Sequence, residues 1–178
     1  TSMNDLDFTG PDGPYIVGLT TTSYMPSTGV LVDADLQFND TSAWFRLTLS
    51  GRTGQGVPGA PGATYIRLGD VATHEMGHAL GLDHSGVKNT CMFFAASDGG
   101  TNLGADDVAG ISSLYPSPEF ATTTGALAGQ VIGNGPVFGA HVVAVSCATG
   151  HPTVAALTQP DGSFEMEGVP PGRYVLVA

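Results

Sequence analysis

The sequence predicts an α+β domain, with a mixed sheet and two helices, followed by an all-β sandwich domain. Three observations support this fold class. Alternating apolar and polar residues indicate strands before residue 70, helical spacing follows at about 70–80 and again at 106–114, and turn residues separate short strands after residue 124. Pro116, Pro118 and a threonine run mark a change of composition between the two parts. We therefore expect domains at 1–118 and 125–178, joined by a linker at 119–124.

The elements of the first domain follow from local patterns. Residues 15–22 are rich in β-branched and aromatic side chains, which favours a strand. In residues 30–38 apolar side chains alternate with polar ones, so one face of a strand is predicted to be buried. The apolar side chains of this strand are Val32, Ala34, Leu36 and Phe38. Residues 43–49 contain Trp44 and are apolar enough to pack on the sheet, glycine and proline indicate a loop at 50–63, and residues 65–68 lead into a helix.

Three histidines lie in or just after this helix. His74 and His78 are four residues apart, so on a helix of about 3.6 residues per turn they project from one face. His84 is six residues further and would lie roughly 9 Å along the axis if the helix continued. We expect the helix to end and turn between them, at Gly81, because glycine adopts a left-handed conformation without a side-chain penalty. The three imidazoles can then reach one ion.

The residue types point to a hydrolytic metal site. Three neutral imidazoles leave the fourth position of a tetrahedral zinc open for water, which distinguishes a catalytic site from a structural one. Glu75 follows the first histidine directly and is the natural base. Zinc lowers the pKa of its water to about 7, and a nearby carboxylate takes the proton as the water attacks a carbonyl. This pattern predicts metal-assisted hydrolysis of a peptide bond.

The complete pattern is longer than the two helical histidines. It reads HExxHxxGxxH and consists of His74, Glu75, His78, Gly81 and His84. It resembles the metzincin metalloprotease signature, and Ser85 directly after the third histidine makes it similar to the matrixin branch. Met92 stands where that clan has a methionine turn beneath the metal, and residues 104–116 (GADDVAGISSLYP) resemble the closing helix of matrixins. The resemblance covers residues 14–116.

This resemblance implies a zincin-type fold, one catalytic zinc held by the three histidines, and Glu75 as general base and then proton donor. Met92 would support the site from below, and the substrate would be a protein or peptide. The strand at 15–22 would pair with an extended substrate, with an ordinary edge strand as the alternative. One of Asp106 and Asp107 would anchor the methionine turn or the mature N-terminus, with acidic residues at a helix start as the alternative. Location outside the cell is implied by the family alone.

The sequence departs from animal matrixins in two places. No histidine precedes His74, so a second, structural zinc is expected to be absent. Asp33 and Asp35 could bind calcium, but solvated carboxylates on a strand are the better reading because Ca²⁺ needs six to eight oxygens. Phe93 and Phe94 stand where animal matrixins have a tyrosine and a proline in the wall of the specificity pocket. They either line an aromatic pocket or are ordinary side chains of the core and of the pocket rim.

The second domain consists of short strands separated by turns. We expect these strands at 127–132, 139–147, 153–158, 163–167 and 174–177. Glycine and proline turns such as Asp161-Gly162 and Pro171-Gly172 resemble the carboxypeptidase regulatory-like family, whose members are small transthyretin-like β-sandwiches. The domain would act as a spacer or bind a cell-surface or matrix partner. His141 and His151 belong to it and are not counted as zinc ligands.

Composition narrows the remaining functions. The formal net charge of −11 argues against nucleic acid and anionic membranes as partners, and no apolar run is long enough to span a membrane. Cys91 and Cys147 are expected to remain unpaired, with Cys91 a small buried side chain or, alternatively, a thiol that ligates zinc.

The chain opens on Thr1 without a signal peptide, so we expect a fragment in which both domains are truncated. The prediction is a secreted zinc-dependent endopeptidase. The alternative is a non-catalytic cell-surface or matrix-binding protein with a degenerate zincin domain, and an intact Glu75 argues against it.

Overall fold

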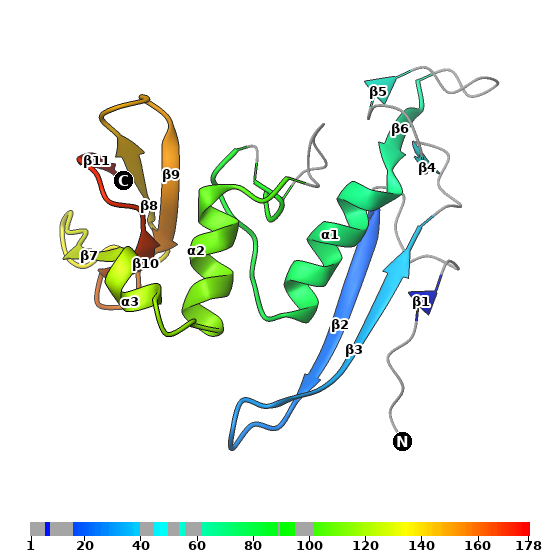
Figure 1. Cartoon of the computed structure of the whole chain (residues 1–178), viewed down its shortest axis with the longest axis horizontal. Helices are drawn as coiled ribbons and strands as arrows, with labels where there is room; N and C mark the ends of the chain where they lie inside the picture. Colours follow the sequence, from blue (N-terminus) through cyan, green and yellow to red (C-terminus); the bar gives the residue numbers. More distant parts are fainter. Residues whose placement is uncertain are drawn as a thin grey trace. The chain divides into compact units, whose positions relative to one another are not determined.

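The computed structural model of the chain describes residues 6–7, 16–39, 45–49, 54–55, 62–88, 90–94 and 102–178 (Figure 1). Two compact units are present and are described separately. The N-terminal unit comprises Thr1–Asp83 and Ala95–Thr101, and the C-terminal unit comprises His84–Phe94 and Asn102–Ala178. Among the described residues, no helix is both long and apolar enough to cross a membrane.

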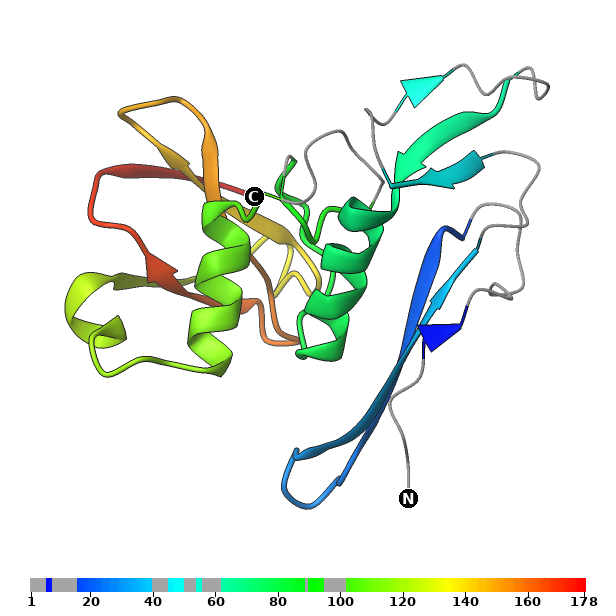
Figure 2. The ribbon, with the colours of Figure 1, turned by 45° about the vertical axis from the view of Figure 1, so that its right-hand side comes forward.

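A long hairpin dominates the N-terminal unit (Figure 2). Strand β2 (Gly18–Tyr24) pairs antiparallel with β3 (Leu31–Phe38), with Thr20 opposite Leu36. The other side of β3 pairs in parallel with β1 (Leu6–Asp7), so β2 is an edge strand within the described part of this sheet. The two strands are those expected at 15–22 and 30–38, shifted by at most three residues.

A second small sheet leads directly into the first helix. Strand β6 (Thr64–Arg67) pairs in parallel with β4 (Phe45–Thr48) and antiparallel with β5 (Gly54–Gln55), and helix α1 (Leu68–Ala79) begins at the next residue. Residues 65–67 therefore form a strand rather than the start of the helix, because β4 pairs with all three and β5 pairs with Tyr65. Trp44 and most of the loop expected at 50–63 lie outside the described residues.

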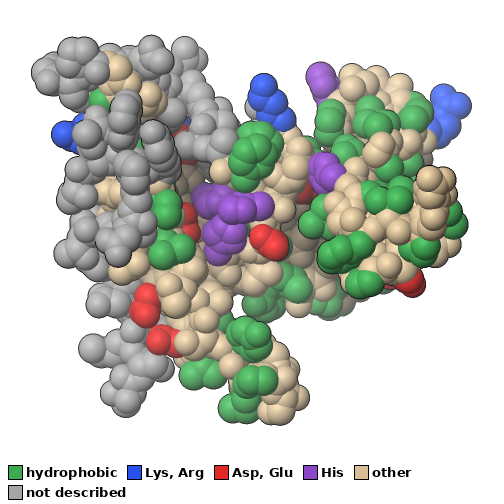
Figure 3. Space-filling view, turned by 180° about the vertical axis from the view of Figure 1, so that it is seen from behind, with side chains coloured by type: hydrophobic (Ala, Val, Ile, Leu, Met, Phe, Trp, Pro, Cys, Tyr) green, Lys and Arg blue, Asp and Glu red, His purple; other side chains and the backbone are tan. Residues whose placement is uncertain are grey.

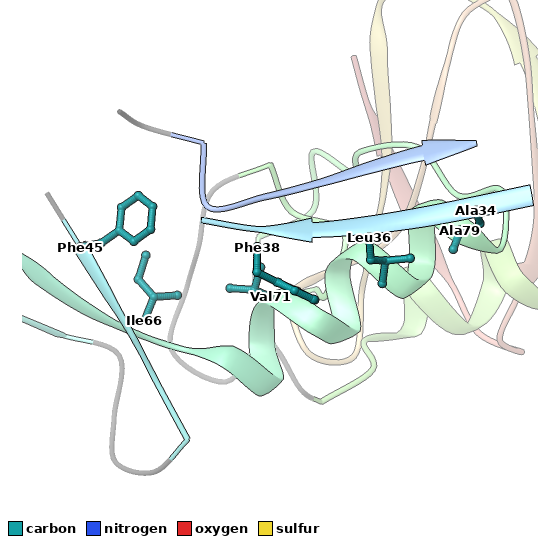
Figure 4. Close-up of a cluster of buried hydrophobic side chains, with 7 residues drawn as sticks. All are labelled: Ala34, Leu36, Phe38, Phe45, Ile66, Val71 and Ala79. Carbon is teal, nitrogen blue, oxygen red and sulfur yellow. The ribbon is translucent and has the colours of Figure 1, made fainter. Parts of the chain in front are cut away.

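Helix α1 packs against the hairpin and buries one apolar cluster (Figure 4). The buried members are Ala34, Leu36, Phe38, Phe45, Ile66, Val71 and Ala79. Three of the four apolar residues predicted to be buried on the β3 face are in this cluster, but Val32 is 53% exposed. The helix ends at Ala79, beside Ala34, so it does not extend far enough to cover Val32.

The described part of the C-terminal unit contains two helices and five strands in two sheets. Helix α2 (Ala105–Leu114) and the short α3 (Phe120–Thr123) precede the strands. In one sheet, β10 (Ser163–Val169) pairs antiparallel with β7 (Gly125–Gln130). The other sheet has the order β11-β8-β9. Its strands are β8 (His141–Ser146), β9 (Pro152–Leu157) and β11 (Tyr174–Val177). Each of the five strands lies within two residues of its expected position.

The buried face of α2 differs from the expected one. The spacing of Val108, Ile111 and Leu114 predicts an apolar face, but Val108 and Leu114 are 47% and 50% exposed. Ala109 is buried instead, in a core shared with strands β8, β9 and β10. Gly168 of β10 passes so close that a Cβ there would lie 2.9 Å from the Cβ of Ala109. A small residue on the helix permits this close packing, which apolar spacing alone does not indicate.

Candidate metal centre

The C-terminal end of α1 turns the chain towards the third histidine. Gly81 has φ +96°, in the region that favours glycine. The amide of Gly81 donates to the carbonyl of His78 at 2.9 Å, and the amide of Leu82 donates to the carbonyl of Gly77 at 2.9 Å. These two bonds form a Schellman motif, which satisfies carbonyls left open where the helix ends. The predicted turn at Gly81 is therefore confirmed.

This turn brings the three histidines together. His74, His78 and His84 each offer a ligand atom, and these atoms lie within 4.8 Å of one another. The Nε2 atoms of His74 and His78 are 3.1 Å apart. Two nitrogens bound to one tetrahedral zinc at about 2.0–2.1 Å are roughly 3.3 Å apart, so this pair fits the ion closely. Figure 3 shows histidine side chains gathered on one face of the molecule.

The hydrogen bonding of His78 also fits a metal ligand. Its Nδ1 lies 2.8 Å from the carbonyl oxygen of Leu82, which can only accept, so Nδ1 carries the proton. In the neutral ring the lone pair is then on Nε2, the atom that lies 3.1 Å from Nε2 of His74. A main-chain carbonyl that fixes the tautomer in this way is a common support for metal-binding histidines.

Glu75 points away from solvent towards β2. Its exposure is 3%, and its Oε2 accepts a hydrogen bond of 2.7 Å from the hydroxyl of Thr20. A buried carboxylate needs such a donor because it has lost its hydration. The sequence pattern identified Glu75 but did not identify Thr20, which is 55 residues away.

The segment around Met92 is tied to the residue that follows the third histidine. The amide of Ser85 donates to the carbonyl of Met92 at 2.7 Å, and Met92 is 3% exposed. Asp107 holds the segment from the other side, since its carboxylate accepts hydrogen bonds from the amides of Cys91, Met92 and Gly104. Of the two aspartates considered, Asp107 is therefore the one that contacts the methionine turn.

Asp106 has a different set of partners. Its carboxylate accepts hydrogen bonds from the hydroxyl of Ser85 at 2.5 Å and from the amide of Ala155 on β9 at 2.7 Å. Burial raises the pKa of this carboxyl above its usual value, while the hydrogen bonds from Ser85 and Ala155 act in the opposite direction. Asp106 thus links the start of α2 both to the segment after His84 and to the C-terminal strands.

The remaining candidate residues lie outside the histidine cluster. Cys91 is buried and not disulfide-bonded, as expected, and it is absent from the metal-binding group found among the described residues. Cys147 is exposed and also unpaired with another cysteine. Phe94 is 67% exposed and Phe93 is half-buried, with their ring centroids 4.5 Å apart. His141 packs so closely against Gly86 that a Cβ there would clash with its imidazole ring.

The histidine pair on a helix, its intervening glutamate and the third histidine after a glycine turn have the arrangement of an HExxH metal site. Residues 3–116 match the model of the family described as Matrixin. Since this match covers more than half of the chain, the protein belongs to the matrixin family, whose members are zinc metalloendopeptidases.

Several curated relatives are similar to parts of the chain. The hatching enzyme of Paracentrotus lividus is 33% identical over 109 residues, which are 60% of this chain and 15% of that protein. Stromelysin-2 of Rattus norvegicus is 35% identical over 97 residues, 52% of this chain and 17% of that protein. Metalloendoproteinase 5-MMP of Arabidopsis thaliana is 47% identical over 57 residues, 31% of this chain and 16% of that protein. The chain thus spans less than a fifth of each of these relatives. No solved structure matches it.

Proposed function

We propose that this chain is a zinc-dependent endopeptidase, with His74, His78 and His84 as the metal ligands and Glu75 as the general base. The observation that carries the proposal is the convergence of three histidine ligand atoms within 4.8 Å of one another, with the buried Glu75 directly after His74 on the same helix. When bound, zinc would polarise the substrate carbonyl and activate a water molecule. Glu75 would take the proton from the attacking water and return it to the leaving amine.

Edge strand β2 supports an extended peptide as the substrate. Within the described residues it pairs with β3 alone, so its other edge can receive another strand. A peptide added there would gain main-chain hydrogen bonds whatever its side chains are, which suits a protease that acts on proteins. Phe93 and Phe94, which follow the methionine turn, are the residues we would examine first for side-chain preference.

The rest of the chain we assign as follows. Residues 1–118 form the catalytic domain, with Met92 and Gly81 as supporting residues, and residues 125–178 form a transthyretin-like β-sandwich after a linker at 119–124. Support for the sandwich comes from two antiparallel sheets whose side chains share one core. The sandwich would act as a spacer or bind a cell-surface or matrix partner, and the protein would work outside the cell. Calcium at Asp33 and Asp35 is a secondary proposal that rests on their shared face of β3 alone.

Cleavage of a denatured protein substrate tests the activity. We expect cutting that a zinc chelator abolishes, and that Glu75→Ala loses while it still binds one zinc ion. Glu165→Ala, on an exposed position of β10, is the matched control and should cut like the wild type. A folded chain that binds one zinc and cuts nothing would contradict the endopeptidase and favour the adhesion alternative.

A further inference from the structure

The carboxylate of Glu75 is held at one oxygen by a side chain from the opposite strand. Glu75 is 3% exposed, and Thr20 on β2 donates a hydrogen bond of 2.7 Å from Oγ1 to its Oε2. The same hydroxyl lies 2.9 Å from the main-chain carbonyl oxygen of Glu75. Among the described residues, Thr20 is the donor found for this carboxylate. The hydroxyl therefore limits the directions in which the carboxylate can point.

The other oxygen lies against a glycine of the same strand. Gly18 is two residues before Thr20 and so faces the same side of β2. A Cβ at Gly18 would lie 2.5 Å from Oε1 of Glu75 and 2.8 Å from Cγ1 of Val71. Any larger residue at position 18 would displace the carboxylate, because Val71 of α1 is itself buried in the core and leaves no space on its side. One strand thus shapes the surroundings of both oxygens.

We propose that Thr20 is a positioning residue for Glu75, and that its hydroxyl, with Gly18 beside the second oxygen, fixes the direction in which this carboxylate exchanges a proton. The inference rests on the proposed role of Glu75 as general base. Orientation matters to such a group because a misplacement of about 1 Å can cost roughly a hundredfold in rate. Since β2 is also the strand proposed to pair with the substrate, the same strand would fix the position of the peptide relative to the carboxylate of Glu75.

A pair of substitutions at position 20 separates the hydroxyl from the shape of the side chain. Thr20→Val keeps the shape and removes the donor, whereas Thr20→Ser keeps the donor. We expect Thr20→Val to lower kcat about 10- to 100-fold with KM changed less than about twofold, and Thr20→Ser to restore kcat to within about threefold of the wild type. Zinc content should remain one ion per chain in both variants.

Thr158→Val is the matched control for loss of a buried hydroxyl. Thr158 is 1% exposed in the C-terminal unit, where its hydroxyl donates to the carbonyl of Val137 and accepts from the amide of Ala140. Its removal should lower the melting temperature and leave kcat unchanged. A fall in kcat that merely follows lower stability would therefore appear in this variant as well.

Thermal unfolding supplies a readout that does not depend on activity. Thr20→Val should lower Tm by about 2–4 °C when Glu75 is present, because the buried carboxylate loses its donor, and by less in a Glu75→Ala background, where the hydroxyl has only the main-chain carbonyl of residue 75 as its acceptor. Wild-type kcat in Thr20→Val, or an equal Tm change in both backgrounds, would overturn the inference while the endopeptidase stands. A wild type without chelator-sensitive cutting, or an active Glu75→Ala, would overturn the proposed function and this inference together.

Discussion

The Nδ1 atom of His78 lies 2.8 Å from the carbonyl oxygen of Leu82, four residues later in the chain. The carbonyl is available because α1 has ended and Gly81 has reversed the chain at φ +96°. The turn therefore does two things, since it carries the chain towards His84 and holds the ring of His78 in the tautomer that exposes Nε2. Disturbing the turn should affect stability and metal binding at once.

Gly81→Ala tests this relationship. The alanine would occupy a left-handed conformation at a cost of about 1–2 kcal/mol, and the shifted carbonyl of Leu82 should weaken zinc binding by about 10- to 100-fold. Urea unfolding and zinc titration measure the two effects. Gly29→Ala is the control, because φ there is +70° on the hairpin turn and a Cβ would meet nothing within 4 Å. It should show the loss of stability with unchanged zinc affinity, and equal zinc affinity in both variants would contradict the argument.

Asp107→Asn should loosen the methionine turn. The buried carboxylate accepts three main-chain hydrogen bonds, and an amide offers one oxygen where the carboxylate offers two. At least one amide among those of Cys91, Met92 and Gly104 would lose its partner, so we expect a loss of about 1–3 kcal/mol in the free energy of unfolding. Urea unfolding checks this, with Glu165→Gln on exposed β10 as a neutral control. A variant as stable as the wild type would show that the three bonds contribute little.

His84→Ala and His141→Ala should differ in bound zinc. Both histidines belong to the C-terminal unit, but His84 is part of the histidine cluster, whereas His141 packs beside Gly86. We expect His84→Ala to weaken zinc binding by at least about a hundredfold, since it removes a ligand rather than a ligand's support. Metal analysis after dialysis should still find one zinc per chain in His141→Ala. Loss of zinc from both variants alike would refute the assignment of the third ligand.

Asp106 should make stability depend on pH. Burial raises the pKa of its carboxyl, so the folded state favours the protonated form more than the unfolded state does. The stability that protonation provides is fully present below the unfolded pKa of about 3.9 and is lost as pH rises through the folded-state pKa. Asp106→Asn removes this ionisation. The free energy of unfolding, measured in urea from pH 3 upwards, should therefore rise in the variant relative to the wild type as pH rises. A difference between the two proteins that does not change with pH would contradict the raised pKa.

Local patterns predicted much of this structure. The convergence of His74 and His78 follows from the helical period, and the turn at Gly81 follows from the one residue type that tolerates its backbone angle. The strands of the hairpin and of the C-terminal unit were also predictable, because alternation and turn residues are properties of neighbouring positions.

Other features depended on segments that are distant in sequence. Spacing predicted the wrong buried face for α2, because close packing of Ala109 against Gly168 decided which side turns inward. The sequence likewise left open whether Asp106 or Asp107 contacts the methionine turn. Asp107 does so because the fold places its carboxylate beside Met92, 15 residues earlier in the chain.

What the sequence by itself determined is the chemistry available to the protein: three histidines and a glutamate at spacings that a helix and one glycine turn bring together. Only the tertiary structure decided how Glu75 is held, since the Thr20 hydroxyl reaches it from a strand 55 residues away. The physical reason is that spacing along a helix is set by local backbone geometry, whereas a buried carboxylate takes whichever donor the packing of distant elements places beside it.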